Sequence, residues 1–211
     1  MFSPEKARAW YSENDPVHGF DHVQRVFKLA NEIGKELNAD LGILSAAALL
    51  HDSARVDPLS QSGTHEHEQD AASFAQTFLM DEGWEEEKIR AVQHCIIAHR
   101  FRGKQAPQTL EAKILFDADK LDVLGAFGAA RTIGYAVQAR QPIFAEPSKE
   151  FISSGLTQRG EPHSAYHEYL FKLKNIHKNL HTDPAKRMAK QRRKVLVQFF
   201  EQLAAEARSE A

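Results

Sequence analysis

The sequence predicts an all-α protein that folds as a single-domain helical bundle. Apolar residues recur at intervals of three and four along most of the chain, whereas the period-2 alternation that marks strands is scarce. The chain has 211 residues, of which 42% are hydrophobic. That length can bury one good core and is short for two, so we expect one domain spanning residues 1–211.

Start and stop signals divide the chain into helices separated by three long loops. Asp21 and Asp40 are candidate N-caps for the second and third helices. The third helix is apolar on nearly every side, as expected of an element in the middle of a bundle. Glycine, proline and polar residues predict loops over 53–64, 100–108 and 140–162. The expected helices cover residues 4–12, 22–38, 41–50, 65–82, 85–99, 109–138 with a break at Gly125, 164–181 and 184–207.

Charge and cysteine content exclude several classes of protein. Lys and Arg total 27 against 29 Asp and Glu, a net charge of -2, which excludes a globally basic nucleic-acid wrapper. The single cysteine, Cys95, excludes a disulfide framework or a cysteine-based metal cage and fits a reducing cytosol. Neither a signal peptide nor a membrane span is visible, so we expect a cytoplasmic protein without membrane contact. The 11 histidines beside many carboxylates offer nitrogen and oxygen to a borderline or hard divalent metal.

One combination of these residues could build a metal site. The dipeptide His51-Asp52 closes an apolar helix, where an unpaired aspartate would be costly to bury. Consecutive helical residues differ by about 100° in direction, so the pair can hold one ion from adjacent corners but cannot complete the site. His22 and Asp119, from two other helices, would bring the donors to two imidazoles and two carboxylates, with water in the open positions. Asp117 competes with Asp119 for the last place.

The order and context of these residues resemble the HD superfamily of metal-dependent phosphohydrolases, with its H…HD…D signature. The matching segments are His22-Val-Gln-Arg-Val, His51-Asp52 after Ala-Ala-Ala-Leu-Leu, and Ala118-Asp119-Lys-Leu-Asp122. The resemblance implies an HD core over about 18–125 and a C-terminal helical hairpin over about 162–207 packed on it. It implies metal ligation by His22, His51, Asp52 and Asp119. In layout the chain is similar to small bacterial nucleoside triphosphate pyrophosphohydrolases.

The expected chemistry is hydrolysis of a phosphate ester or anhydride by metal-activated water. A metal that acidifies water and neutralises phosphate oxygens meets both needs of that reaction. Mixed imidazole and carboxylate ligands favour Mn²⁺, with Fe²⁺, Co²⁺, Ni²⁺ or Mg²⁺ as alternatives. We expect one ion per chain and a phosphorylated small molecule, most simply a nucleotide, as substrate. A homodimer stays open, and nucleic acid is not an expected partner.

Further residues are assigned supporting roles. Asp52, His18 and Asp122 are the candidate catalytic groups, although Asp122 could equally form a salt bridge to Lys120 or a neighbouring arginine. His18 could equally stabilise a turn, and Arg25 could lie on the surface. The candidate substrate-binding residues are Arg25, His67, His99, Lys120 and Lys172.

Two rival functions remain open. Superfamily members with two metals add histidines between the HD pair and the last aspartate, so His67 and His99 also fit a dinuclear-iron oxygenase. A basic stripe over 186–194 fits a non-catalytic module that binds a nucleotide or nucleic acid. His65 and His94 are interpreted as solvated or capping histidines. The C-terminal pairs His163/His167 and His177/His181 are interpreted as surface pairs, because they lack the glutamate of a zincin motif. Cys95 is interpreted as packing.

Overall fold

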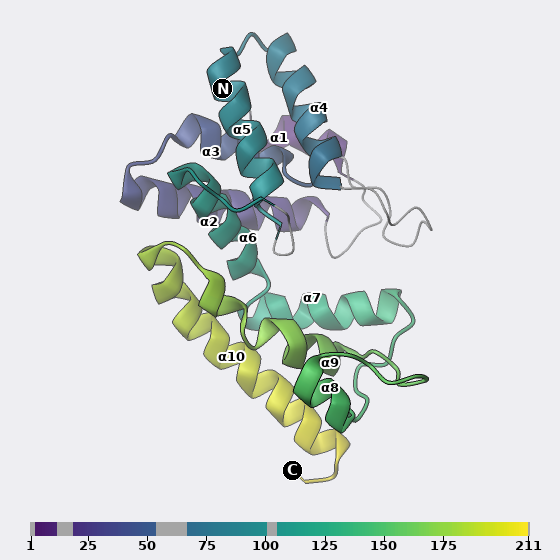
Figure 1. Ribbon diagram of the computed structural model, residues 1–211. Helices are drawn as coiled ribbons and strands as arrows, with labels where there is room; N and C mark the ends of the chain where they lie inside the picture. The colour runs from purple at the N-terminus through teal and green to yellow at the C-terminus, as the bar shows by residue number, and fades with distance from the viewer. Residues whose placement is uncertain (1–2, 12–18, 54–66, 101–104, 211) are drawn as a thin grey trace. The chain divides into compact units, whose positions relative to one another are not determined.

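A computed structural model describes residues 3–11, 19–53, 67–100 and 105–210 (Figure 1). Within these ranges the regular elements are helices and no strand occurs, which confirms the all-α class. The chain divides into two compact units. The first comprises Met1–Asp119 and His181–Ala185, and the second comprises Lys120–Leu180 and Lys186–Ala211.

The first unit is built around α3. In this helix every residue from Ala46 to Leu50 is buried. It packs against α1, α2, α4 and α5, so the prediction of a central buried helix is confirmed. The elements of the unit are α1 (Pro4–Ala7), η1 (Arg8–Trp10), α2 (Phe20–Leu37), α3 (Leu41–Leu50), α4 (His67–Asp81), α5 (Glu86–Ala98) and α6 (Leu110–Asp122) as far as Asp119.

The predicted N-cap is confirmed for α3 and wrong for α2. Asp40 caps α3 as expected, because its Oδ1 accepts hydrogen bonds from the backbone amides of Gly42 at 2.8 Å and Ile43 at 3.1 Å. The prediction of Asp21 as the cap of α2 is wrong. That helix begins after Gly19, and Asp21 lies in its first turn, where a negative charge still complements the helix dipole.

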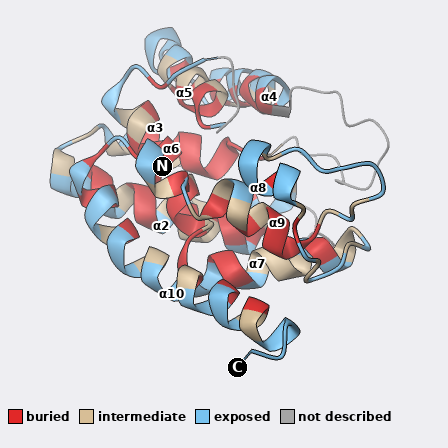
Figure 2. Ribbon diagram, turned by 60° about the horizontal axis from the view of Figure 1, so that its bottom comes forward, coloured by how far each residue is buried: buried red, intermediate tan, exposed pale blue. Residues whose placement is uncertain are grey.

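The second unit contains the remaining helices. The break predicted at Gly125 is confirmed, since α6 ends at Asp122 and a new helix begins at Gly125. Tyr169 and Phe200 are both fully buried and stack with ring centroids 4.6 Å apart. The C-terminal helix alternates buried and exposed residues along its length (Figure 2). The elements are α7 (Gly125–Gln138), α8 (Lys149–Ser154), α9 (Ala165–Glu168), η2 (Tyr169–Leu173), η3 (Ile176–Asn179) and α10 (Asp183–Ala207), whose first three residues belong to the first unit.

Two predictions for this unit are wrong in detail. The expected loop over 140–162 contains α8, a helix of six residues that is too short to show helical periodicity. The single helix expected over 164–181 is instead three short pieces, of which η2 is a π-type turn. In that turn Phe171 closes over Gly155, where an added Cβ would lie 2.3 Å from the ring. Tertiary packing of this kind overrides local helix propensity.

Membrane-crossing segments are absent from the described ranges, because no helix there combines the necessary length with sufficient apolar character.

Candidate metal centre

Three histidines and two aspartates gather in the first unit. His22 Nε2 lies 3.4 Å from Asp119 Oδ1 and 3.9 Å from Asp52 Oδ2. The Asp52 carboxylate also lies 3.7 Å from His51 Nε2 and 3.8 Å from His99 Nε2. His22 belongs to α2 and Asp119 to α6, while the other three stand at the C-terminal ends of α3 and α5. All but Asp119 are buried.

The carbonyls at two helix ends fix the tautomer of two of these imidazoles. His51 is the C-cap residue of α3, and its Nδ1 donates a hydrogen bond to the carbonyl of Ala48 at 2.9 Å. His99 is the C-cap residue of α5, and its Nδ1 donates a hydrogen bond to the carbonyl of Ile96 in the same way. These carbonyls belong to the last turn of a helix, where the backbone leaves acceptors unused. A proton on Nδ1 leaves the lone pair on Nε2, the arrangement that metal-ligating histidines use.

His51 carries the sharpest indication of a ligand. Its Nε2 is fully buried and has no hydrogen-bond partner within the described ranges. Burial lowers the pKa of His51, with the charge of Asp52 acting in the opposite direction, so the imidazole is neutral near pH 7. A buried acceptor without a partner is costly to maintain. A neutral imidazole with a free lone pair is also the state that a metal requires.

The donor atoms lie at, or a few tenths of an ångström beyond, the spacing that one bound metal ion requires. Two atoms that each lie about 2.1 Å from one ion are separated by about 3.0 Å at a right angle and about 3.4 Å at a tetrahedral angle. The ligand atoms of His22, His51 and Asp119 lie within 4.8 Å of one another, and so do those of His51, Asp52 and His99. His51 therefore belongs to both groups. Nitrogen and carboxylate oxygen together are the donor set of a borderline divalent metal.

The structure separates the two candidate aspartates of α6. Asp119 faces His22, whereas Asp117 accepts hydrogen bonds from the backbone amides of His181 at 2.8 Å and Thr182 at 2.7 Å. Of the pair, only Asp119 joins the cluster.

Four other residues named from the sequence lie elsewhere. Arg25 is half-buried on α2, one turn beyond His22. Asp122 and Lys120 follow Asp119 along α6 but belong to the second unit. There the Asp122 carboxylate accepts a hydrogen bond from Arg131 at 2.9 Å, the structural alternative that the sequence left open. Lys172 forms an ion pair with Glu168 at 3.1 Å.

Three histidines of interest fall outside this description. His18 and His65 lie outside the described residues. His67 is the first residue of α4, and its side chain is outside the description as well.

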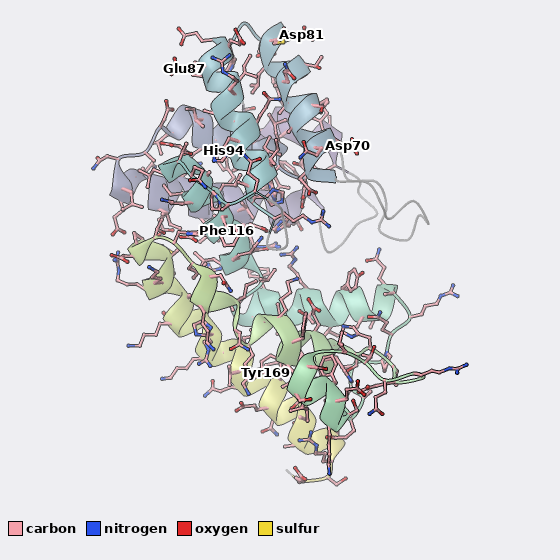
Figure 3. All side chains as sticks on the ribbon, in the orientation of Figure 1. Asp70, Asp81, Glu87, His94, Phe116 and Tyr169 are labelled. Carbon is pink, nitrogen blue, oxygen red and sulfur yellow. The ribbon has the colours of Figure 1, made fainter. Side chains whose placement is uncertain are left out.

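Three further histidines, His94, His163 and His167, have partners outside the cluster. His94 on α5 (Figure 3) accepts a hydrogen bond from the Gln108 backbone amide at 3.0 Å, which fits its interpretation as a capping residue. His167 bonds to Ser164 at 2.7 Å and to Glu161 at 3.2 Å. Its neighbour His163 lies 5.6 Å away, ring to ring. The surface position expected for this pair is wrong for His167, whose side chain is fully buried.

One contact at the end of α3 comes from a residue that the sequence does not single out. The hydroxyl of Tyr11 donates a hydrogen bond to the carbonyl of Leu49 at 2.9 Å, within the last turn of α3. The two residues are separated by 38 positions. No local pattern signals a contact over that distance.

Known proteins share both the sequence pattern and the fold. The uncharacterised protein YpgQ of Bacillus subtilis (strain 168) is 31% identical over 210 residues, which cover 94% of this chain and 91% of YpgQ. The crystal structure of YpgQ in complex with ADP matches with a TM-score of 0.73 and 27% identity over 97% of each chain. A Lactobacillus plantarum protein matches with a TM-score of 0.76 and 27% identity, covering 98% of this chain and 95% of that one.

One protein of similar structure is described as a hydrolase. An HD-superfamily hydrolase from Bacillus thuringiensis has a TM-score of 0.65 and 26% identity, covering 97% of this chain and 96% of its own. The HD domain family itself matches residues 19–124, a segment that includes all five members of the cluster. The chain belongs to the HD domain family.

Proposed function

We propose that this protein is a divalent-metal-dependent phosphohydrolase that acts on a nucleotide. The observation that carries the proposal is the buried Nε2 of His51, held in its ligating form by the Ala48 carbonyl and facing acidic groups. Membership of the HD family and the similar HD-superfamily hydrolase support hydrolysis. The ADP complex of YpgQ supports a nucleotide as the substrate class.

Four side chains would hold the ion: His22, His51, Asp52 and Asp119. When bound there, a divalent ion supplies a water molecule of lowered pKa and a positive charge beside the phosphate oxygens. We propose Mn²⁺ as the ion, because two imidazoles and two carboxylates suit it better than they suit Mg²⁺.

Other residues would bind and orient the substrate. Arg25 stands one turn from His22 on α2, so its guanidinium can reach a phosphate group next to the cluster. We assign His99 to the same role, because its Nε2 is 3.8 Å from Asp52 at the edge of the ligand set. The assignments of His67, Lys120 and Lys172 to substrate binding, and of His18 and Asp122 to catalysis, stand as proposals from the sequence.

The proposed reaction is attack of water on the α-phosphorus of a nucleoside triphosphate. A bond forms between the water oxygen and phosphorus, and the bond from phosphorus to the bridging oxygen breaks. The attacking water releases a proton to solvent, pyrophosphate leaves with the electron pair of the broken bond, and the other product is the monophosphate.

A substrate screen tests this function. The full chain, stripped by a chelator and reloaded with Mn²⁺, is offered nucleoside mono-, di- and triphosphates, and the products are identified by phosphorus NMR. We expect about one metal per chain and release of pyrophosphate without any need for oxygen. His51→Ala should abolish the reaction, and His163→Ala, which changes a histidine of the second unit, should not. Absence of hydrolysis with Mn²⁺, Fe²⁺, Co²⁺, Ni²⁺ and Mg²⁺ alike would exclude the proposal.

One rival has structural support. His99 adds a further donor beside Asp52, and a dinuclear-iron oxygenase would need donors of this kind for its second iron, because the free lone pair of His51 can bind only one ion. That function predicts two irons per chain and turnover that stops when oxygen is removed. The same metal analysis and an anaerobic assay therefore distinguish the two. A module that binds nucleotide or nucleic acid without turnover would show neither reaction, together with a steep salt dependence of oligonucleotide binding.

A further inference from the structure

The last turn of α3 is closed by side chains. The final four carbonyls of an α-helix lack backbone partners within the helix. Here the Ala48 carbonyl accepts a hydrogen bond from His51 Nδ1. The Leu50 carbonyl accepts two hydrogen bonds from Ser53, from its amide at 3.1 Å and its hydroxyl at 2.9 Å. Both donors follow directly in the chain.

The carbonyl between these two is bonded from a distant segment. The Leu49 oxygen accepts the hydrogen bond from Tyr11, which directly follows η1. The ring of Tyr11 packs on Phe20 at the start of α2, with centroids 5.8 Å apart. The residue before Tyr11 is anchored as well. The ring of Trp10 lies edge-on to that of Phe74 on α4, with centroids 5.3 Å apart. Contacts on both sides therefore hold the phenol against the end of α3.

The Leu49 carbonyl lies just before both ligands of the HD pair in the chain. His51 is the C-cap residue of α3, and Asp52 follows it directly. The hydrogen bond from Tyr11 therefore acts within one helical turn of both ligands.

We infer that Tyr11 is a positioning residue for the metal ligands His51 and Asp52. By holding the Leu49 carbonyl, it fixes the direction in which the chain leaves α3, and with it the direction of both ligand side chains. The inference rests on the proposed metal-dependent function. Groups that orient metal ligands through hydrogen bonds typically change metal affinity by about 10- to 100-fold when removed.

The test is metal affinity in Tyr11→Phe. This variant keeps the ring that packs on Phe20 and removes only the hydroxyl. Calorimetric titration of the chelator-stripped full chain with Mn²⁺, at a temperature where circular dichroism shows each variant folded, should give a Kd about tenfold weaker than wild type. A purely structural tyrosine would lower the melting temperature without changing this Kd.

Tyr166→Phe is the matched control. Tyr166 belongs to the second unit, where it is buried and packs on Phe144 with centroids 5.1 Å apart. It loses a phenolic hydroxyl in the same way, and its Mn²⁺ affinity should equal that of wild type. Equal affinities in folded Tyr11→Phe and wild type would refute the positioning role and leave the proposed function intact. A wild-type chain that binds none of Mn²⁺, Fe²⁺, Co²⁺, Ni²⁺ and Mg²⁺ would refute both.

Discussion

Asp117 and Thr182 are joined by two hydrogen bonds, one from the Thr182 amide and one from its hydroxyl, both 2.7 Å long. The His181 amide adds a third at 2.8 Å. All three donors precede α10, so Asp117 ties this segment to α6 within the first unit. Two positions further along α6, Asp119 faces His22 instead. Two neighbouring carboxylates of one helix therefore have separate roles.

Exchange of these carboxylates for amides should separate stability from metal binding. Asp117→Asn places an NH₂ group among three donors and should lower the free energy of unfolding by about 2 kcal/mol, while Mn²⁺ affinity stays close to wild type. Asp119→Asn should have the opposite profile, with metal binding lost and stability of the metal-free chain nearly unchanged. Urea unfolding and calorimetric titration measure the two quantities.

Asp81→Asn serves as the control for that pair, because Asp81 is exposed at the end of α4 (Figure 3). It should change neither quantity. Loss of metal binding in Asp117→Asn at unchanged stability would contradict the division of roles.

Removal of His51 should abolish both metal binding and hydrolysis. His51→Ala deletes the residue shared by the two groups of ligand atoms. Metal content by mass spectrometry should fall to background, and activity should fall with it, while far-UV circular dichroism stays largely intact. Asp52→Ala should behave alike. Near wild-type turnover in either variant would show that the reaction takes place elsewhere.

Acid should weaken the second unit through Glu161. This carboxylate accepts hydrogen bonds from the backbone amides of Ser148 and Gln158, both at 2.7 Å, which lower its pKa to about 2. The pKa in an unfolded chain is about 4.3. A depressed pKa stabilises the folded state above pH 4.3, and the contribution is lost as the pH falls from there toward 2.

Melting temperatures across pH test this linkage. Glu161→Gln should melt below wild type at pH 7, and the difference should shrink below pH 4.3 and vanish near pH 2. Glu150→Gln changes an exposed glutamate of α8 and should match wild type throughout. A difference between Glu161→Gln and wild type that is constant from pH 7 to 2 would refute the linkage.

Cys95 should be chemically silent in the folded protein. It is fully buried in α5, and burial raises the pKa of its thiol to about 12. Because the thiolate is the reactive form, native protein should not react with Ellman's reagent at pH 8, whereas urea-unfolded protein should release one equivalent. Reaction of the native chain at the rate of free cysteine would be inconsistent with this packing.

Most helix positions could be predicted from short-range sequence signals such as caps and glycines. Asp40 caps α3 through the amides two and three residues later, and the break before Gly125 follows from the positive φ that this glycine adopts. The pieces over 165–179 could not be anticipated. Their shape depends on contacts such as that of Phe171 with Gly155, which join residues too far apart in the chain for a local sequence pattern to indicate.

The cluster of histidines and aspartates was predictable to a similar extent. The family pattern named His22, His51, Asp52 and Asp119, because ligand order survives in sequence. The sequence also distinguished His99, a candidate for substrate binding, from His94, interpreted as a capping residue. It did not place His99 beside Asp52, because that approach depends on how α3 and α5 pack against each other.

The members of the cluster are supplied by four helices that lie far apart along the chain, so the unfolded polypeptide cannot assemble the site. Any ion that binds there selects the folded state. At a free concentration one hundred times its Kd, such an ion adds about 2.7 kcal/mol to the free energy of unfolding. The supply of metal in the surroundings would then govern how much of the protein survives heat or proteolysis, independently of any reaction it performs.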